Sequence, residues 1–204
     1  MGTNINCDTQ LKENQAMTKF QTHTVESAPP NSQRFLQDAH KANGFVPNLL
    51  AGMAEAPALL EAYVTVSGIF DKTSFSATER QIVLMTSNRL NGCTYCMAAH
   101  TSISQMSGVP EDVVAALRNN TPIADAKLEA LRQFSIVIVE TRGWPSEDQV
   151  NRFTDAGYSK QNILEVILGT SMKVMSNYTN HIANTPLDEA FKPNAWSGPL
   201  TSAA

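Results

Sequence analysis

The sequence predicts an all-α fold. Hydrophobic residues recur at three- and four-residue spacing along most of the chain, and no stretch shows the two-residue alternation of a half-buried strand. Helix-capping residues and glycines separate these periodic stretches, as expected between helices. The chain has 204 residues, of which 42% are hydrophobic and 17% are charged. It is therefore long and apolar enough for one ordinary core or for two small, closely packed repeats.

The N-terminal residues 1–27 differ from the rest, because they are polar, lack periodicity and end at an Ala-Pro-Pro triplet. We expect a flexible arm there, in which Cys7 is a bystander thiol. Residues 28–204 are expected to form a single helical domain whose redox core lies at about 76–108.

Each expected helix begins or ends at a residue suited to that position. Proline at the first helical position and Ser or Asp at the N-cap mark the starts, and glycine marks several ends. The start signals, in chain order, are Pro57, Ser76, Pro110, Asp125, Ser146 and Ser159. The end signals are Gly44, Gly92, Gly108 and Gly143. The helices expected from these signals lie at 31–43, 57–72, 76–90, 93–107, 110–117, 126–142, 147–156 and 160–182.

Two features of the pattern concern the chain as a whole. The last helix, 160–182, is apolar nearly all round, so we expect it to be buried. Long helices follow shorter helical turns in each half of the chain, which leaves an internal pseudo-repeat open. Because several helices carry apolar residues that a single layer of short helices cannot hide, we also expect a homo-oligomer.

Charge and composition exclude several classes of function. A formal net charge of −4 gives no basic surface for nucleic acid. No apolar run reaches the roughly 20 residues that span a bilayer, so no membrane partner is expected. The N-terminus lacks both the basic and the apolar region of a secretory signal. Three cysteines are too few for a secreted disulfide scaffold, so the expected compartment is the cytoplasm.

The stretch that carries the chemistry is 91–100, with the sequence NGCTYCMAAH. On a helix, Cys96 lies one turn after Cys93 and His100 one turn after Cys96, so two thiols and an imidazole share one face. A disulfide in so short a loop adds little stability, which favours a dithiol that cycles over a structural crosslink. The helix N-terminus favours the thiolate of Cys93, and the imidazole of His100 favours that of Cys96.

Two other interpretations of these residues stay open. Two buried, inert cysteines beside a hydrogen-bonded histidine would show the same spacing. A structural zinc site would need a fourth ligand besides two thiolates and an imidazole, and the sequence has no second Cys-x-x-Cys or His-x-x-His pair. We therefore expect neither a cofactor nor a bound metal.

Four further residues are candidates for the site. The capping box alone explains Glu79, but as an acid it is also a candidate to orient His100 or to relay its proton. Gln81 is neutral and can only hydrogen-bond. Tyr95 lies between the cysteines and faces either the core or the pocket. His181 ends the last long helix, either as an exposed residue matched to the helix dipole or as a pocket residue.

Residues 77–84 and 91–100 together resemble the AhpD-like core of the carboxymuconolactone decarboxylase superfamily, and most closely its peroxidase-related alkylhydroperoxidase branch. Residues 45–50 and 178–188 are similar to the same branch, so the likeness extends over most of 31–191. The decarboxylase branch lacks the cysteine pair, which argues against lactone decarboxylation.

The resemblance implies an all-helical homo-oligomer, often a trimer or hexamer, that reduces hydroperoxides without a cofactor. In that family the second cysteine attacks the peroxide, the first resolves and the histidine is the base. These roles fall on Cys96, Cys93 and His100. The family's relay glutamate falls on Gln81, so either Gln81 or the nearby Glu79 would take its part.

From these observations we expect an antioxidant thiol peroxidase that acts on organic hydroperoxides or hydrogen peroxide. An external dithiol, either a protein or a lipoyl-type donor, would restore the two thiols. The alternatives are a general thiol–disulfide oxidoreductase and a non-catalytic helical module that senses redox state or holds a metal.

Overall fold

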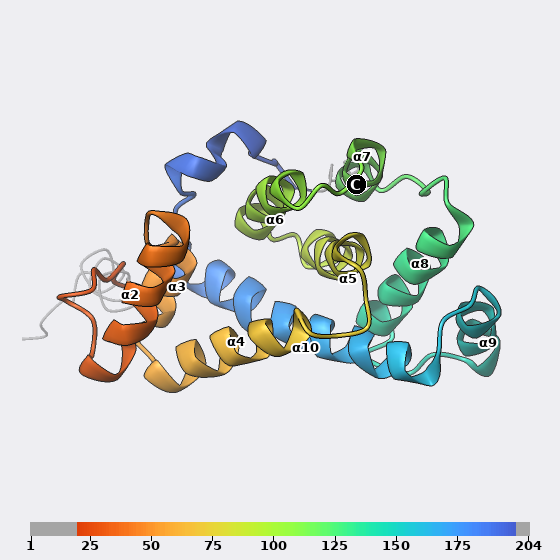
Figure 1. The fold of residues 1–204 in the computed structure, drawn as a ribbon, viewed down its shortest axis with the longest axis horizontal. Coiled ribbons are helices and arrows are strands. Elements are labelled where there is room, and N and C mark those ends of the chain that lie inside the picture. The colour runs from red at the N-terminus through yellow and green to blue at the C-terminus, as the bar shows by residue number, and fades with distance from the viewer. Residues whose placement is uncertain (1–19, 199–204) are drawn as a thin grey trace, which may run out of the picture.

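The computed structural model describes residues 20–198, and this part of the chain contains helices and no strand, which confirms the all-α prediction (Figure 1). The α-helices are α2 (Pro30–Asn43), α3 (Asn48–Met53), α4 (Pro57–Phe70), α5 (Ala77–Leu90), α6 (Thr94–Met106), α7 (Glu111–Asn119), α8 (Ala126–Glu140), α9 (Glu147–Asp155) and α10 (Lys160–Ala183). A 3-10 helix, η1 (Glu189–Asn194), follows α10 and has no counterpart among the predicted elements.

Helix α5 lies in the middle of the molecule. It packs against α6, α8 and α10, and its residues 81–88 are all buried (Figure 1). Its predicted capping box is present, with the Ser76 hydroxyl accepting from the Glu79 amide and the Glu79 carboxylate accepting from the Ser76 amide. At its other end Gly92 adopts a φ of 67°, a left-handed conformation that glycine takes without strain, and the chain turns there into α6. A well-packed helix thus sets where the cysteine helix begins.

Helix α10 runs beside α4 and crosses α5 (Figure 1). The crossing requires Gly169, because a Cβ there would lie 2.8 Å from the Phe70 ring and 2.8 Å from a Val83 methyl. The prediction that this helix is buried is wrong for one of its sides. The helices packed on α10 cover only the opposite side. The uncovered side carries these exposed apolar residues: Leu164, Ile167, Val174, Tyr178 and Ile182.

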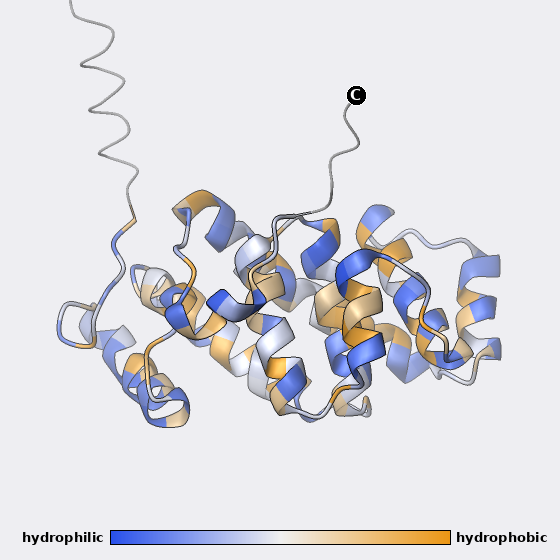
Figure 2. Ribbon diagram, turned by 90° about the horizontal axis from the view of Figure 1, so that it is seen from above, coloured by the Kyte–Doolittle hydropathy of each residue, from blue (hydrophilic) through white to orange (hydrophobic). Residues whose placement is uncertain are grey.

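The interior consists of two hydrophobic clusters. The larger is formed by α4–α10 and includes a stack of Phe134, Phe153 and Tyr158. The smaller is formed by α2, α3, α4 and the start of α6, and it contains both cysteines of the predicted redox pair. Most helices carry hydrophobic and hydrophilic residues together, as Figure 2 shows, which fits helices that bury one side.

Residues 20–27, which the sequence predicts as the end of a flexible arm, are docked on the helical domain. The His23 amide donates to the Ala51 carbonyl at 3.3 Å, and the His23 ring donates from Nε2 to Glu55 at 2.7 Å. The rest of the predicted arm, including Cys7, lies outside the described residues. Within residues 20–198, no helix is long and apolar enough to cross a membrane.

Candidate active site

The two cysteines of the predicted pair stand at the N-terminus of α6. Cys93 is the N-cap residue, and its Sγ accepts a hydrogen bond from the Cys96 amide at 3.4 Å. Both thiols are free, and both residues are about 1% exposed. The two thiols are therefore close together and shielded from bulk water.

Polar side chains of α10 reach the two sulfurs. The Nδ2 of Asn180 lies 3.1 Å from Sγ of Cys96 and 3.7 Å from Sγ of Cys93. An amide N–H stabilises a sulfur that carries negative charge more than a neutral one. The sequence marks Asn180 only as part of the stretch 178–188, because its contact with the cysteines depends on how α10 packs against α6.

The pKa values of the two thiols are shifted in opposite directions. Burial raises the pKa of Cys96, but the hydrogen bond from Cys93 and the positive charge of Lys173 lower it by more, with help from amide donors on α10. The hydrogen bond to Cys96 raises the pKa of Cys93, and burial raises it further. The thiolate form is therefore favoured at Cys96, and the protonated form is favoured at Cys93.

The ring of His100 is held from both nitrogens. Its Nδ1 lies 2.9 Å from Oε1 of Gln81 on α5, and its Nε2 lies 3.0 Å from Nζ of Lys173 on α10. An amide oxygen only accepts and an ammonium only donates, so Nδ1 carries the hydrogen and Nε2 accepts. Burial and the charge of Lys173 hold the pKa of His100 well below its usual value. The imidazole is thus neutral, and within residues 20–198 no hydrogen bond joins it to either cysteine.

Lys173 is the residue of this cluster that sequence reasoning missed. It is fully buried, and no carboxylate in the described part of the chain forms an ion pair with it. The available signal was a single charge inside the otherwise apolar middle of α10, between Met172 and Val174. A lysine is rarely buried without a partner, so such a position marks a functional candidate.

Tyr95 faces both the core and the site. Its hydroxyl donates to Asp188 at 2.6 Å and accepts from the Leu49 amide at 3.2 Å. Asp188 also accepts from the Asn48 amide at 3.1 Å, so one tyrosine ties α6 to α3 and to the segment before η1. Burial raises the pKa of Tyr95 well above its usual value, which keeps the hydroxyl protonated.

Two predicted candidates lie away from the cluster. Glu79 is engaged by Ser76 and by the Tyr158 hydroxyl at 3.0 Å, and not by His100. Burial raises the pKa of Glu79, but the hydrogen bonds from Ser76 and Tyr158 lower it by more. His181 is exposed on the outer side of α10 beside Tyr178. Gln81, and not Glu79, therefore contacts the imidazole.

A line of asparagines, of which Asn88 and Asn177 are buried, fixes the start of α6. Asn91 donates to Asn177 at 2.8 Å, Asn177 donates to Asn88 at 3.0 Å, and Asn88 donates to the Cys96 carbonyl at 3.3 Å. Because these amides join α5, α6 and α10, they hold the cysteine turn at a set distance from Asn180.

A cavity of about 570 Å³ opens above the cluster. Cys96, His100 and Lys173 form its polar end, together with Tyr95. The rest of its lining is largely apolar: Phe45, Leu49, Leu50, Ile103, Met106 and Phe191. This cavity has room for an organic molecule whose polar end faces the thiolate.

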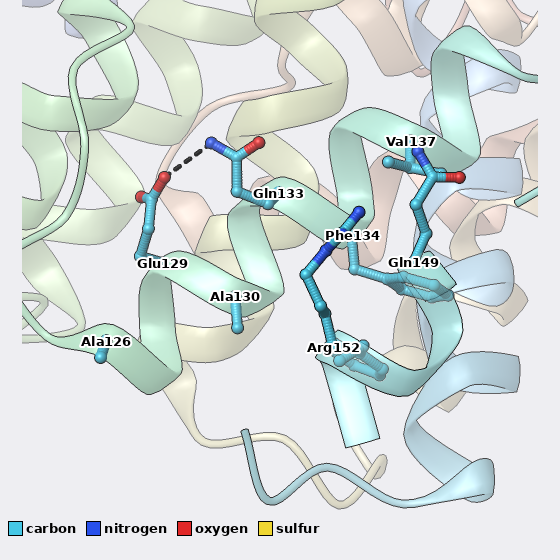
Figure 3. A pocket seen from close by; sticks show the side chains of 9 residues that line it. Ala126, Glu129, Ala130, Gln133, Phe134, Val137, Gln149 and Arg152 are labelled. Carbon is cyan, nitrogen blue, oxygen red and sulfur yellow. Dashed lines mark hydrogen bonds between the residues drawn. The ribbon is translucent and has the colours of Figure 1, made fainter. Parts of the chain in front are cut away.

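A second hollow, of about 440 Å³, lies between α8 and α9 (Figure 3). Figure 3 shows Glu129, Gln133 and Arg152 at its wall, with a hydrogen bond of 2.7 Å from Gln133 to Glu129. Within the described part of the chain, its lining includes no thiol and no imidazole. Across residues 20–198, no group of three or more His, Cys, Asp or Glu side chains is placed to hold a metal ion.

Comparison with known proteins supports the class that the sequence predicts. Residues 57–135 match the sequence model of the carboxymuconolactone decarboxylase family, a span that includes α5 and the cysteine helix. The predicted likeness to this family is thereby confirmed for that core. No protein of curated function matches the chain.

Solved structures share the fold at low sequence identity. An AhpD-core, uncharacterized peroxidase-related protein from Ralstonia eutropha JMP134 is similar with a TM-score of 0.76 and 16% identity, over 85% of this chain and 93% of that one. An uncharacterized peroxidase-related protein from Silicibacter sp. TM1040 gives 0.71 and 18%, over 85% and 94%. The debrominase Bmp8, as a cysteine-to-alanine variant with 2,3,4-tribromopyrrole, gives 0.68 and 18%, over 81% and 89%. The chain therefore has the AhpD-like fold.

Proposed function

We propose that this protein is a thiol peroxidase that reduces organic hydroperoxides through Cys96 and Cys93. The observation that carries the proposal is the position of the two sulfurs: Cys96 is at the polar end of an apolar cavity, and Cys93 donates to it from the same helical turn. Ionised sulfur attacks peroxide, whereas a neutral thiol does not. The peroxidase-related proteins of the same fold favour the same chemistry.

The reaction proceeds in two steps at the cysteine pair. The Cys96 thiolate attacks the distal oxygen of the hydroperoxide, the O–O bond breaks, and an alkoxide leaves with its electron pair and takes up a proton. Cys93 then attacks the resulting sulfenic sulfur, and water leaves as the disulfide forms. An external dithiol reduces that disulfide by exchange and restores both thiols. No cofactor is needed for this cycle.

The lining and the burial of the cavity restrict which substrates and which reductants can reach the two cysteines. Its phenylalanine, leucine and methionine lining would bind an alkyl or aryl group, which favours organic hydroperoxides over hydrogen peroxide. Both sulfurs are about 1% exposed, so a bulky protein disulfide has no direct path to them. This disfavours a general disulfide reductase and favours a slender dithiol, such as a lipoyl-type arm, as the reductant.

Trapping of the sulfenate tests the proposal. Cys93→Ser should form a sulfenic acid at Cys96 when a stoichiometric alkyl hydroperoxide is added, as read by mass spectrometry of a sulfenate-specific adduct. Cys96→Ser should consume no peroxide, because the attacking sulfur is gone. A sulfenate at Cys93 in the Cys96→Ser protein would reverse the roles, and no sulfenate in either protein would refute the peroxidase.

Reductive dehalogenation is a second candidate, favoured by the fold shared with the debrominase Bmp8 together with the apolar cavity. Cys96 would take the halogen from an aryl carbon that gains a proton, and Cys93 would then displace halide to form the same disulfide. Bromide release from a bromopyrrole, with one disulfide formed per bromide, would support this candidate. The same protein with an alkyl hydroperoxide provides the direct comparison.

We also propose that the chain works as a homo-oligomer in the cytoplasm, with a trimer or hexamer as the expected assembly. The exposed apolar side of α10 supports the first part, since contiguous apolar surface of this kind marks an interface. A dithiol that must be reduced in each cycle supports a reducing compartment.

A further inference from the structure

We propose that Lys173 is the acid–base residue of this site: its ammonium group pairs with the Cys96 thiolate and gives its proton to the oxygen that leaves. The proposal rests on the peroxidase function proposed above. It assigns to a lysine on α10 the proton transfer that the spacing of the cysteine helix suggests for His100.

Charge balance gives the first argument. Lys173 is fully buried, and it forms no ion pair with a carboxylate anywhere in residues 20–198. The titratable groups that face it are Cys93, Cys96 and His100 on α6 and Tyr63 on α4. Of these, only Cys96 has its ionised form favoured. The thiolate is thus the one counter-charge available to the buried ammonium, and each group lowers the cost of burying the other.

The proton count at His100 gives the second argument. Its Nδ1 hydrogen is directed at Gln81, and its Nε2 lone pair is occupied by Lys173. A neutral ring held in this way has no hydrogen to offer toward the cavity. Gln81 cannot accept a proton, so no carboxylate stabilises an imidazolium there. His100 is therefore a positioning residue, which holds the ammonium at the floor of the cavity.

Lys173 stands where the proton is needed. It lines the polar end of the cavity with Cys96 and His100, and its ammonium carries three hydrogens, of which His100 takes one. A peroxide whose distal oxygen meets the Cys96 sulfur would place its leaving oxygen at this same end. Among the described residues, no other lysine or arginine lines the cavity.

The proton is conserved over the whole cycle. The thiolate attacks the distal oxygen, the S–O bond forms and the O–O bond breaks, and the leaving alkoxide takes a proton from Lys173, which becomes a neutral amine. Cys93 condenses with the sulfenic acid and releases water. When an external dithiol reduces the disulfide, the restored Cys96 thiol returns its proton to the Lys173 amine. Ammonium and thiolate are thereby regenerated together.

The test distinguishes two roles of Lys173: stabilising the Cys96 thiolate by its charge, and donating a proton to the leaving oxygen. In a Cys7→Ser, Cys93→Ser background Cys96 is the single thiol, so its ionisation can be followed by thiolate ultraviolet absorbance against pH. Lys173→Met removes the charge at similar volume, Lys173→Arg keeps a charge that does not give up its proton, and Lys160→Met on the same helix is the exposed control. Thermal unfolding shows that each variant is folded.

Lys173→Met should raise the pH midpoint of Cys96 ionisation, and sulfenate formation at neutral pH should slow by about 100-fold or more. Lys173→Arg should keep the midpoint near that of the parent while sulfenate formation stays slow. Lys160→Met should change neither. An unchanged midpoint and rate in Lys173→Met would overturn the proposal, and full activity in Lys173→Arg would overturn proton donation.

The same measurements distinguish this proposal from the peroxidase function. One possible result is that Cys96 ionises at neutral pH in the parent protein but not in Lys173→Met, while the parent reacts with no hydroperoxide. This result would support the charge pair. That result would refute the peroxidase, and proton donation to a leaving oxygen with it.

Discussion

The two sides of α10 are the reverse of what a helix in a globular protein usually shows. Toward the interior, its C-terminal half presents Lys173, Asn177 and Asn180, all buried. Toward solvent, the same helix presents large apolar side chains such as Leu164 and Ile182, which are 66% and 70% exposed. Buried polar groups lower stability unless they are partnered, and exposed apolar groups gain nothing in water. We infer that the inner side serves the chemistry of the dithiol and the outer side serves assembly.

The largest effect is expected from substitutions on the outer side of α10, which should change the oligomeric state. Ile182→Asp combined with Leu164→Asp should convert the proposed oligomer to monomers, because each aspartate would have to lose its hydration in an apolar interface. Sedimentation at micromolar concentration measures this, against the 22.2 kDa mass of one chain. Asn151→Asp, on the exposed face of α9, is the control for added charge. A parent protein that sediments as a clean monomer would refute the assembly.

The next largest effect is on the inner side, at Asn180. Asn180→Leu keeps the volume but removes the donor to both sulfurs. Since a hydrogen bond to a charged group contributes about 1.5–3 kcal/mol, the pKa of Cys96 should rise by about one to two units. Alkylation of the thiol with iodoacetamide, followed against pH, measures the shift. Thr179→Val, one residue earlier on α10, removes a hydroxyl that contacts only a backbone carbonyl and should leave the profile unchanged.

The comparison also shows what the sequence was able to predict. Helix ends followed from local signals such as the Ser76 capping box, and spacing on one helix put Cys93 and Cys96 in a single turn. Contacts between helices did not follow, because they depend on packing. His100 shares a face with Cys96, but Gln81 and Lys173, from two other helices, hold its nitrogens.

A smaller effect is expected at His100. His100→Leu removes the acceptor that positions Lys173, so the peroxide reaction near neutral pH should slow by about tenfold, as expected for a lost hydrogen bond to a charged group. The deficit should shrink at alkaline pH, where Cys96 ionises without help. Stopped-flow rates over a pH series measure it. An equal loss at every pH would mean that His100 serves packing alone.

The smallest effect is expected at Glu79, whose side chain hydrogen-bonds to Ser76 and Tyr158 rather than to either side of α10. A glutamine already completes the capping box at Ser146 and Gln149, so Glu79→Gln should preserve the box and its contact with Tyr158. Because the pKa of Glu79 is below its usual 4.5, its ionised form stabilises the fold near neutral pH, and that contribution is lost as the pH falls through the folded-state pKa. We therefore expect a loss of at most about 1 kcal/mol in the free energy of unfolding near neutral pH. The loss should vanish in acid, as measured by urea denaturation.

Peroxide reduction by Glu79→Gln should be unchanged, since no hydrogen bond links Glu79 to the cluster around Cys96 within residues 20–198. A large loss of rate with unchanged stability would instead place Glu79 in the proton path, and Gln81→Glu should then leave the rate unchanged or raise it.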